Sequence, residues 1–257
     1  MADEFRSWLL PTADNPFEEL LASVLFDDVA KGRRGTVLVK VDAGGIPIVR
    51  TTTPYRAPAQ PFLDIHDRLA QQIRGHASCA FNNALVEHYT NAYSTMKRHS
   101  DQALDLADES SIAVYSCYRD PRRPSRRLIV KSKESDTIFE ILLTHGSVIA
   151  FSLDTNRRFT HGIALCANAP DNEWLGITLR TSKTFVRFVD GHPQLSNGER
   201  LTLANDEQRR EFFQLRRREN DETGFKYPSI SYTISESDLR LPELPPRWSS
   251  GGEPVRG

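Results

Sequence analysis

The stretch Tyr93–Asp101 reads YSTMKRHSD and carries a His-x-Asp pair, His99 and Asp101. A third candidate ligand, His161, follows much later in the chain, within the sequence FTHGI. Two imidazoles and one carboxylate form a facial triad, which holds iron(II) on one side and leaves coordination positions open on the other. Strand-like sequence surrounds each member, so the pattern predicts a β fold whose strands bring these three side chains together.

Arg180 completes the pattern, within the sequence LRTSKTF. The open positions of such an iron site suit the keto acid 2-oxoglutarate and O₂. A later arginine can hold the far carboxylate of that co-substrate through two parallel, charge-assisted hydrogen bonds. The ordered set of His99, Asp101, His161 and Arg180 therefore predicts a non-haem iron(II), 2-oxoglutarate-dependent oxygenase.

Short segments with the character of β strands dominate the chain after residue 82, separated by Gly, Pro, Asn and Asp. They read NALVEHYT, SSIAVYSCY, RRLIVKSK, TIFEILL, GSVIAFSL, HGIALCA, WLGITLRT and KTFVRFV. Even spacing of this kind predicts a mostly β fold with flanking helices, with a double-stranded β-helix (jelly roll) as its core. In that fold the metal ligands converge at an open mouth.

Local sequence signals predict the remaining elements. Helical spacing of apolar residues predicts helices over 14–30, 61–75 and 206–220, and two short strands, 36–43 and 46–53, form an expected hairpin. The last helix is expected to bury Phe212, Phe213 and Leu215. We divide the chain into helices and a hairpin that form a lid or support (1–80), the oxygenase core (81–190), a C-terminal helical extension (191–241) and a disordered tail (242–257).

The composition excludes several classes of protein. Three cysteines without a CxxC pair (Cys79, Cys117 and Cys166) support neither a disulfide framework nor a zinc knuckle. No apolar run approaches the ~20 residues that span a bilayer, and the N-terminus lacks the features of a secretion signal. A formal net charge of −1 argues against a protein that coats nucleic acid by bulk electrostatics. We expect a cytoplasmic protein with no membrane contact, and no obligate protein partner is evident.

From about Asn82 to Phe188 the chain resembles the AlkB family of iron(II)/2-oxoglutarate dioxygenases. The motifs that carry the resemblance are NNALVEHYTNAYSTMKRHSD, HGSVIAFSLDTNRRFTHGIAL and RTSKTF. The resemblance implies that His99, Asp101 and His161 hold iron. It also implies that Arg180, assisted by Tyr89 and Ser182, holds the distal carboxylate of 2-oxoglutarate.

The chain departs from the family pattern at one important position. The family has a second arginine six residues after the first, and here that position is Val186. The residue that holds the C1 carboxylate of 2-oxoglutarate is therefore left open. In an alternative register, ITLR matches the later arginine of the family, and Arg180 then lies beside the C1 carboxylate.

The substrate is the least determined part of the prediction. Known members of the family oxidise N-alkyl groups on nucleobases, so oxidative dealkylation (demethylation) of a base is the first hypothesis. Arg50, Tyr55 and Arg56 are then expected to contact phosphate and to stack on the base, and the basic run 119–133 to contact further phosphates. The alternatives are hydroxylation of a small molecule, such as a nucleotide, amino acid or other metabolite, and a non-catalytic jelly-roll binding protein.

Overall fold

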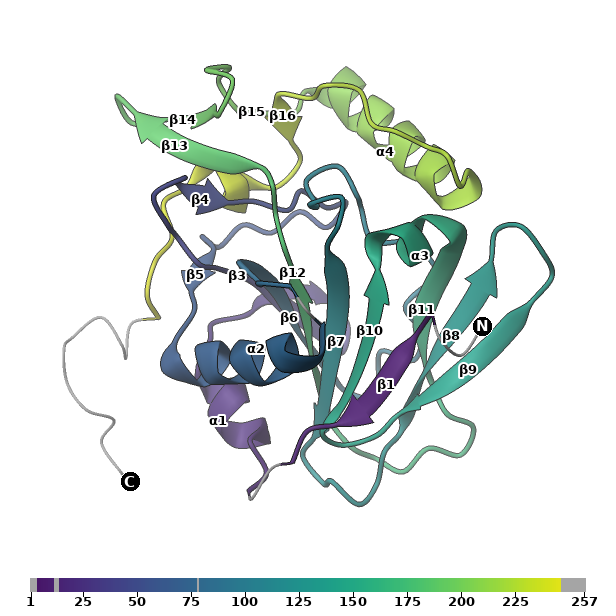
Figure 1. Ribbon diagram of the computed structural model, residues 1–257. Coiled ribbons are helices and arrows are strands. Elements are labelled where there is room, and N and C mark those ends of the chain that lie inside the picture. The colour runs from purple at the N-terminus through teal and green to yellow at the C-terminus, as the bar shows by residue number, and fades with distance from the viewer. Residues whose placement is uncertain (1–3, 12–13, 78, 246–257) are drawn as a thin grey trace.

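Two β-sheets lie against each other in the computed structural model, which describes residues 4–11, 14–77 and 79–245 (Figure 1). The larger sheet has the order β1-β10-β7-β12-β6-β3-β2, and β5 pairs with β3 off this path. Its strands are β1 (Arg6–Leu9), β2 (Asp27–Ala30), β3 (Arg33–Val39), β5 (Gln60–Pro61), β6 (Asn83–Tyr89), β7 (Ser111–Tyr118), β10 (Ser147–Ser152) and β12 (Trp174–Arg180). Neighbours in this sheet are antiparallel, except for the short parallel pair of β3 and β5.

The smaller sheet gains a fourth strand from the segment 94–99. Its regular strands, in the order β11-β8-β9, are β8 (Arg126–Ser132), β9 (Ile138–Leu143) and β11 (Phe159–Leu165). Along the free edge of β11, the Met96 N–H donates to the Ile163 carbonyl at 2.8 Å. Further along, the backbones of His99 and His161 bond reciprocally at 2.8 and 2.7 Å. The His-x-Asp segment is therefore held to β11 by backbone pairing at Thr95 and His99, with a one-residue shift of register between the two bridges.

The chain winds between the two sheets as a double-stranded β-helix does. β6, β7, β10 and β12 are central strands of the larger sheet, whereas segment 94–99, β8, β9 and β11 form the smaller one. Successive parts of the chain thus cross from one sheet to the other around a shared interior. The expected mostly β fold with a jelly-roll core is confirmed.

Both faces of the larger sheet are buried, because α1 (Phe17–Ala22) and α2 (Asp64–Ala77) cover the face that turns away from the smaller sheet (Figure 1). Successive side chains of a strand point to opposite faces. In β7, Val114 packs with Leu128 between the sheets, whereas its neighbour Tyr115 packs with Ile73 of α2. Two-sided burial explains why this strand carries apolar residues on both faces, as in Ile112–Tyr115.

The C-terminal elements form a separate layer above one end of the two sheets (Figure 1). The short elements there, with a one-turn helix, are β4 (Ile46–Pro47), β13 (Phe185–Val189), β14 (His192–Leu195), β15 (Thr202–Leu203), β16 (Tyr232–Thr233) and η1 (Glu236–Leu239). The long helix of this layer is α4 (Asp206–Asp221), and α3 (Leu153–Arg158) joins β10 to β11. α4 begins with a capping box, in which Asn205 and Gln208 each accept the other's backbone N–H.

A buried ion pair attaches this layer to the core. Arg50 and Asp105 lie 2.7 Å apart, with side chains 3% and 0% exposed. The Arg50 guanidinium also donates to the carbonyls of Ile230, at 2.7 Å, and Tyr232. Removing either partner would leave an uncompensated buried charge, which typically costs about 3–5 kcal/mol. The pair therefore holds the C-terminal segment against the loop that follows β4.

The N-terminal part of the structure differs from the sequence-based expectation. The helix predicted over 14–30 is only α1, because the Ser23 hydroxyl bonds back to the Leu20 carbonyl at 2.7 Å and the chain then enters β2. The hairpin predicted from 36–43 and 46–53 is not formed. β3 pairs with β6 over its whole length, while β4 pairs with β13, so the two stretches meet different partners.

The C-terminal part agrees more closely with the prediction. α4 covers the helix expected over 206–220 and buries Phe212 and Leu215. Phe213, however, is 46% exposed, because it lies on the flank of α4 that faces a cavity. Of the tail expected to be disordered, residues 246–257 lie outside the described residues.

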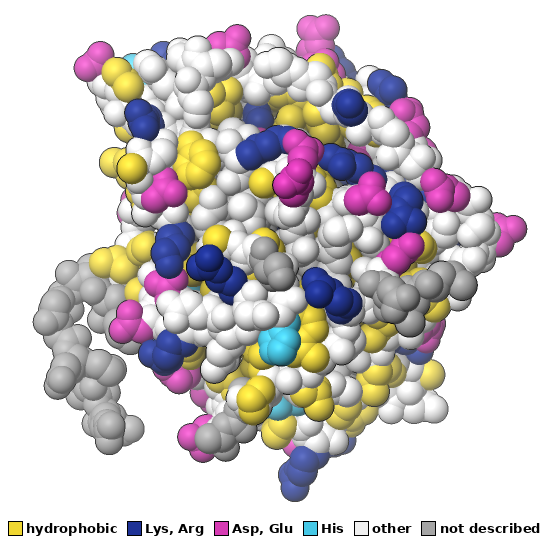
Figure 2. Space-filling view, in the orientation of Figure 1, with side chains coloured by type: hydrophobic (Ala, Val, Ile, Leu, Met, Phe, Trp, Pro, Cys, Tyr) yellow, Lys and Arg dark blue, Asp and Glu magenta, His cyan; other side chains and the backbone are white. Residues whose placement is uncertain are grey.

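The surface has mixed charge. Figure 2 shows basic and acidic side chains interspersed on the face that it presents. The whole chain is nearly balanced, with 33 Lys and Arg against 34 Asp and Glu. Such a face does not produce a strong field of one sign. Among the described residues, no helix is both long and apolar enough to cross a membrane.

Gly162 on β11 permits the close approach of the segment 94–99. A Cβ at this position would lie 2.6 Å from the Met96 carbonyl oxygen and 3.0 Å from the Arg98 nitrogen, both backbone atoms. We therefore expect Gly162→Ala to lower the free energy of unfolding by about 1–3 kcal/mol, the usual cost of overpacking. Urea unfolding measures this change, and Gly75→Ala on α2, where a Cβ would meet nothing within 4 Å, is the control. The control should be neutral or stabilising by up to about 1 kcal/mol; equal urea midpoints for Gly162→Ala and the wild type would contradict the close approach.

Candidate metal centre

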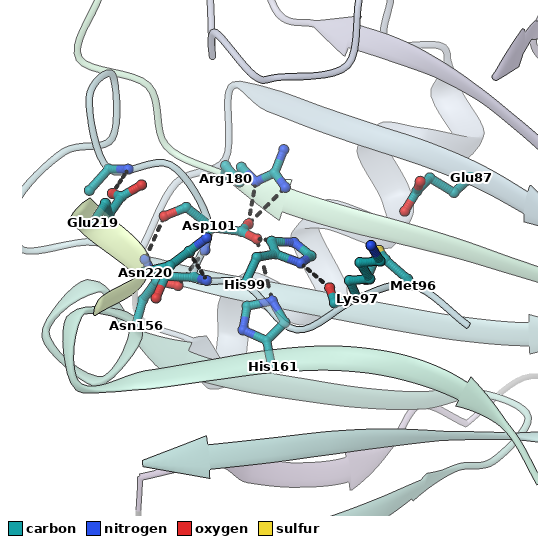
Figure 3. A network of polar contacts seen from close by, with 12 residues as sticks. Glu87, Met96, Lys97, His99, Asp101, Asn156, His161, Arg180, Glu219 and Asn220 are labelled. Atoms are coloured by element: carbon teal, nitrogen blue, oxygen red, sulfur yellow. Dashed lines mark hydrogen bonds and ion pairs between the residues drawn. The ribbon is translucent and has the colours of Figure 1, made fainter. Parts of the chain in front are cut away.

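His99, Asp101 and His161 converge at one end of the smaller sheet (Figure 3). The reciprocal backbone pairing of the two histidines places their rings side by side, with centroids 5.1 Å apart. The Asp101 Oδ1 lies 3.8 Å from the His99 Nε2 and 3.4 Å from the His161 Nε2. One ligand atom from each residue lies within 4.8 Å of the other two.

Hydrogen bonds orient the ligand atoms. The His99 Nδ1 lies 2.9 Å from the Lys97 carbonyl, which can only accept, so Nδ1 carries the proton and Nε2 presents its lone pair. Asn156 accepts from the backbone N–H of Asp101 at 2.7 Å and donates to its carbonyl at 2.8 Å. The Asp101 Oδ2 receives the Nε and Nη2 of Arg180, both at 2.7 Å. The other oxygen, Oδ1, is therefore the one that faces the histidines.

The electrostatics of the site favour the metal-binding protonation states. Burial opposes ionisation of Asp101, but Arg180 and the two histidines together hold its pKa well below the ordinary value. Desolvation, with the charges of His161 and Arg216, lowers the pKa of His99. At neutral pH the cluster thus contains one carboxylate and a neutral His99 imidazole.

The donor set fits a divalent iron ion. Two imidazole nitrogens and one carboxylate oxygen, gathered on one side of a point, match the facial triad that leaves positions open for other ligands. The open side faces a cavity of about 630 Å³. His161 contributes from a ring that packs against Phe151, with centroids 5.1 Å apart, so its orientation is set by the core.

The C-terminal end of α4 is hydrogen-bonded to the turn between His99 and Asp101. Ser100, the middle residue of the motif, donates its N–H to the Asn220 side chain at 3.0 Å, and its carbonyl accepts from Arg216. Glu219 in turn pairs with Arg216 at 2.7 Å. Sequence reasoning missed these helix residues and Asn156, because nothing in their local pattern points to a loop more than fifty residues away. The C-terminal layer is therefore part of the site.

The cavity extends from the triad into the space between the two sheets. Apolar or small side chains on its inner walls are those of Leu85, Val114, Leu128, Ile163 and Thr178, and the ion pair of Arg33 and Glu87 also lines it. Its mouth is lined by the loop 51–53, by Phe213 of α4, and by Lys97 and Arg98. A small co-substrate can thus enter the interior while a larger substrate remains at the mouth.

The residues predicted to hold the co-substrate lie at different depths. Arg180 lines the cavity, but its guanidinium is bonded to Asp101. Tyr89 is fully buried, and its hydroxyl lies 3.4 Å from the Met96 sulfur. The Ser182 hydroxyl is bonded to the backbone carbonyl of Ile48 at 2.6 Å. The structure therefore brings Arg180 to the metal cluster and does not bring the Ser182 hydroxyl there.

The residues predicted to contact substrate are not gathered at the cavity. Arg50 is buried in its pair with Asp105, so its guanidinium has no free face for phosphate. Tyr55 is 3% exposed and packs its hydroxyl end near Gly35 of β3, which leaves no ring face for stacking. Arg56 is exposed, and its backbone N–H donates to Asp27 at 2.8 Å.

The basic run 119–133 does not form one patch. Because its second half is the strand β8, alternate side chains there point in opposite directions. Arg126 is fully buried, whereas its neighbour Arg127 pairs with Glu140 at 3.3 Å on the outside. Arg119 pairs with Glu173 at 2.9 Å. A continuous track for phosphates, as expected from the sequence, is therefore not present.

Three comparisons relate the chain to known proteins. The model of a family described as the 2OG-Fe(II) oxygenase superfamily matches residues 40–204. None of the curated proteins matches the chain. Among solved structures, the chain is similar to one titled "The structure of OsALKBH1", with 12% sequence identity and a TM-score of 0.41, over 58% of this chain and 78% of that one.

Loss of either histidine is expected to abolish metal binding. His99→Ala or His161→Ala should weaken Co(II) or Mn(II) by more than the roughly 10–100-fold that loss of a ligand's hydrogen-bond partner costs. Calorimetric titration under anaerobic conditions measures the affinity. The exposed His192, which lies on β14, gives the matched control His192→Ala, which should bind as the wild type does. Metal binding retained in both His99→Ala and His161→Ala would exclude the triad.

Arg180→Met is expected to make metal binding sensitive to acid. Without the guanidinium, burial raises the pKa of Asp101 above its present, lowered value, so a proton competes with the metal as the pH falls. Metal affinity should drop by roughly 10–100-fold at neutral pH or below, and the drop should begin at a higher pH than in the wild type. Titrations between pH 5 and 8 measure the difference, and parallel pH profiles would contradict the role of Arg180.

Proposed function

Because the family model covers residues 40–204 of 257, the chain belongs to the 2OG-Fe(II) oxygenase superfamily, and we propose that it dealkylates an N-alkylated nucleobase. The chain is an iron(II)- and 2-oxoglutarate-dependent oxidoreductase, as its sequence predicted. The proposal concerns its substrate and the roles of individual side chains.

The proposed roles follow from the geometry. When bound, iron(II) with 2-oxoglutarate and O₂ supplies hydroxylation of a substrate carbon, with release of succinate and CO₂. His99, Asp101 and His161 hold the metal, and Asn156 with the end of α4 keeps their loop in place. An N-methyl group hydroxylated in this way leaves the base as formaldehyde. The apolar walls of the cavity keep water from the reacting carbon.

The proposal for the substrate rests on the residues at the mouth of the cavity. Phe213 lines the cavity and is 46% exposed there, so its ring is accessible to a ligand at the mouth. Lys97 and Arg98 line the same cavity and are exposed, and neither has a carboxylate partner among the described residues. An aromatic ring beside two free cations suits a base that stacks on the ring while its phosphate meets the charges.

A free nucleotide or another small anionic metabolite is the second candidate. The observation that favours it is the division of the basic run, because Arg126 is buried and Arg127 is paired with Glu140. A strand of nucleic acid needs several phosphate contacts, whereas a single nucleotide needs only those at the mouth. The two candidates share the site and differ in the length of the ligand.

Phe213→Ala tests the stacking role. The change should weaken a methylated nucleoside monophosphate or oligonucleotide by about 1–3 kcal/mol, the usual value of one base-stacking contact, and leave Mn(II) affinity unchanged. Fluorescence anisotropy measures the binding of a labelled oligonucleotide, and competition with the monophosphate gives its affinity. Leu203→Ala is the matched control, since Leu203 is similarly exposed, at 43%, but does not line the cavity. Equal losses for Phe213→Ala and Leu203→Ala would contradict stacking.

Salt dependence separates the two candidates. If the substrate is a base within a strand, log affinity falls linearly with log salt, with a slope that grows with each neutralised phosphate. Lys97→Ser combined with Arg98→Ser should then reduce that slope by about one to two. If the substrate is a free nucleotide, the slope is already small, and the double change raises KM for the small molecule instead. Turnover of neither class at low ionic strength would exclude a nucleobase substrate.

A further inference from the structure

The distal carboxylate of 2-oxoglutarate needs a cation that Arg180 does not provide. The Nε and Nη2 of Arg180 both bond the Asp101 Oδ2 at 2.7 Å, so its charge is matched by a carboxylate that belongs to the metal site. Arg33 also lines the cavity, but it pairs with Glu87 at 2.7 Å. Neither guanidinium therefore has its charge free for a second carboxylate inside the barrel.

Arg126 is the buried arginine without a counter-ion. Among the described residues, the buried arginines are Arg50, Arg126, Arg180 and Arg216. The other three each face a carboxylate, namely Asp105, Asp101 and Glu219. Arg126 is 0% exposed and has no carboxylate of the described residues within 4.0 Å, although a buried, unpaired charge costs several kcal/mol.

The guanidinium of Arg126 has N–H donors that make no hydrogen bond with the described residues. Its Nη2 donates to the Thr90 carbonyl at 2.8 Å, but Nε and Nη1 are buried without a hydrogen-bond partner among the described residues. Burial lowers the pKa of Arg126, yet a guanidinium stays protonated at neutral pH. The Trp174 Nε1 is likewise buried and unpartnered. All three groups are donors, so each of them lacks an acceptor.

Its position in the barrel aligns Arg126 with the metal cluster. On β8, Arg126 shares its inward face with Leu128 and Val130, and Val130 lies opposite His161 in the pairing with β11. Four residues separate Arg126 from Val130, roughly 13 Å along a strand, a distance that the arginine side chain and a five-carbon diacid can share. Leu128, between them, lines the cavity that opens on the triad, and Arg126 lies beyond the residues that line it.

The aromatic rings around Arg126 form a site that suits a carboxylate transferred out of water. The Arg126 Cζ lies 5.0 Å from the centroid of the Tyr89 ring, and Tyr89 packs against Trp174 with centroids 4.8 Å apart. The contact fixes one face of the guanidinium and leaves its edge for a bidentate partner. Tyr89, predicted from the sequence as a co-substrate residue, thus lies beside Arg126.

We propose that Arg126 receives the distal carboxylate of 2-oxoglutarate, while Arg180 positions Asp101. The proposal rests on the co-substrate that superfamily membership supplies, and not on the nucleobase proposed above. It assigns the anchor to β8 in the smaller sheet, where the sequence-based reading had assigned it to the end of β12.

The test compares two keto acids on Mn(II)-loaded protein without O₂, by calorimetry. 2-Oxopentanoate has the same carbon chain as 2-oxoglutarate, with a methyl group in place of the distal carboxylate. The wild type should prefer 2-oxoglutarate. Arg126→Met should weaken 2-oxoglutarate by roughly 30-fold or more, the usual effect of truncating a buried, hydrogen-bonded charge pair. The same variant should change 2-oxopentanoate by less than about threefold and leave the affinity for Mn(II) as it is.

Two arginine variants serve as controls. Arg127→Met changes the next residue on the outer face of β8 and should keep the full preference for 2-oxoglutarate. Arg180→Met should weaken both keto acids alike through the metal, with their ratio preserved. In addition, metal-free Arg126→Met should melt at the same temperature as the wild type or higher, because it removes an uncompensated buried charge. A purely structural Arg126 predicts a lower melting temperature instead.

The outcomes are distinct. A preference that survives in Arg126→Met, or is lost only in Arg180→Met, overturns the assignment. If the wild type does not prefer 2-oxoglutarate to 2-oxopentanoate, both the assignment of Arg126 and the use of 2-oxoglutarate as co-substrate are overturned. If Arg126→Met does not fold, Arg126→Lys is the variant that tests the assignment, because lysine keeps the charge but cannot make the bidentate contact. A preference at least several-fold smaller in Arg126→Lys supports the proposal, and an unchanged one overturns it.

Discussion

The reciprocal backbone hydrogen bonds between His99 and His161 are the interaction on which the whole site depends. At 2.8 and 2.7 Å they fix the segment 94–99 to the edge of β11, so two imidazoles become neighbours through strand pairing alone. Gly162 makes this possible, because any larger residue would meet the backbone of the paired segment. Asp101 follows just beyond the paired stretch, where Asn156 holds its peptide groups and Arg180 holds its Oδ2, so that Oδ1 faces the rings.

Buried charge has a regular arrangement around this contact. Asp101, Asp105 and Glu219 are buried carboxylates, and each faces its own arginine. These pairs hold together the metal loop, the loop after β4 and the end of α4. They couple the C-terminal layer to the site, because Arg216 and Asn220 both bind Ser100 between two proposed ligands. Arg126 differs from this pattern, because it is a buried cation and no carboxylate of the described residues pairs with it.

Prediction from the sequence succeeded where local pattern and spacing are sufficient. Even spacing and turn residues indicated the strands of the jelly roll, and apolar spacing indicated the helix that the structure forms as α4. Prediction failed where the structure depends on which strands pair with each other. Residues 36–43 and 46–53 have the pattern of a hairpin, but β6 and β13 compete successfully for their backbone groups. For the same reason the run 119–133, which is continuous in sequence, is divided between the inside and the outside of the barrel.

The sequence by itself determined the chemistry of the chain: an ordered set of two histidines, an aspartate and an arginine on a mostly β framework belongs to few reaction types. Residue identity is sufficient for this, since ligand atoms and charge are properties of side chains. Only the tertiary structure decided which charges meet. It paired Arg180 with Asp101, buried Arg50 and Tyr55 away from the cavity, placed Phe213 at its mouth and left Arg126 unpaired inside. The physical reason is that the energy of a charge depends on its partner and its burial, and both arise from contacts between residues far apart in the chain.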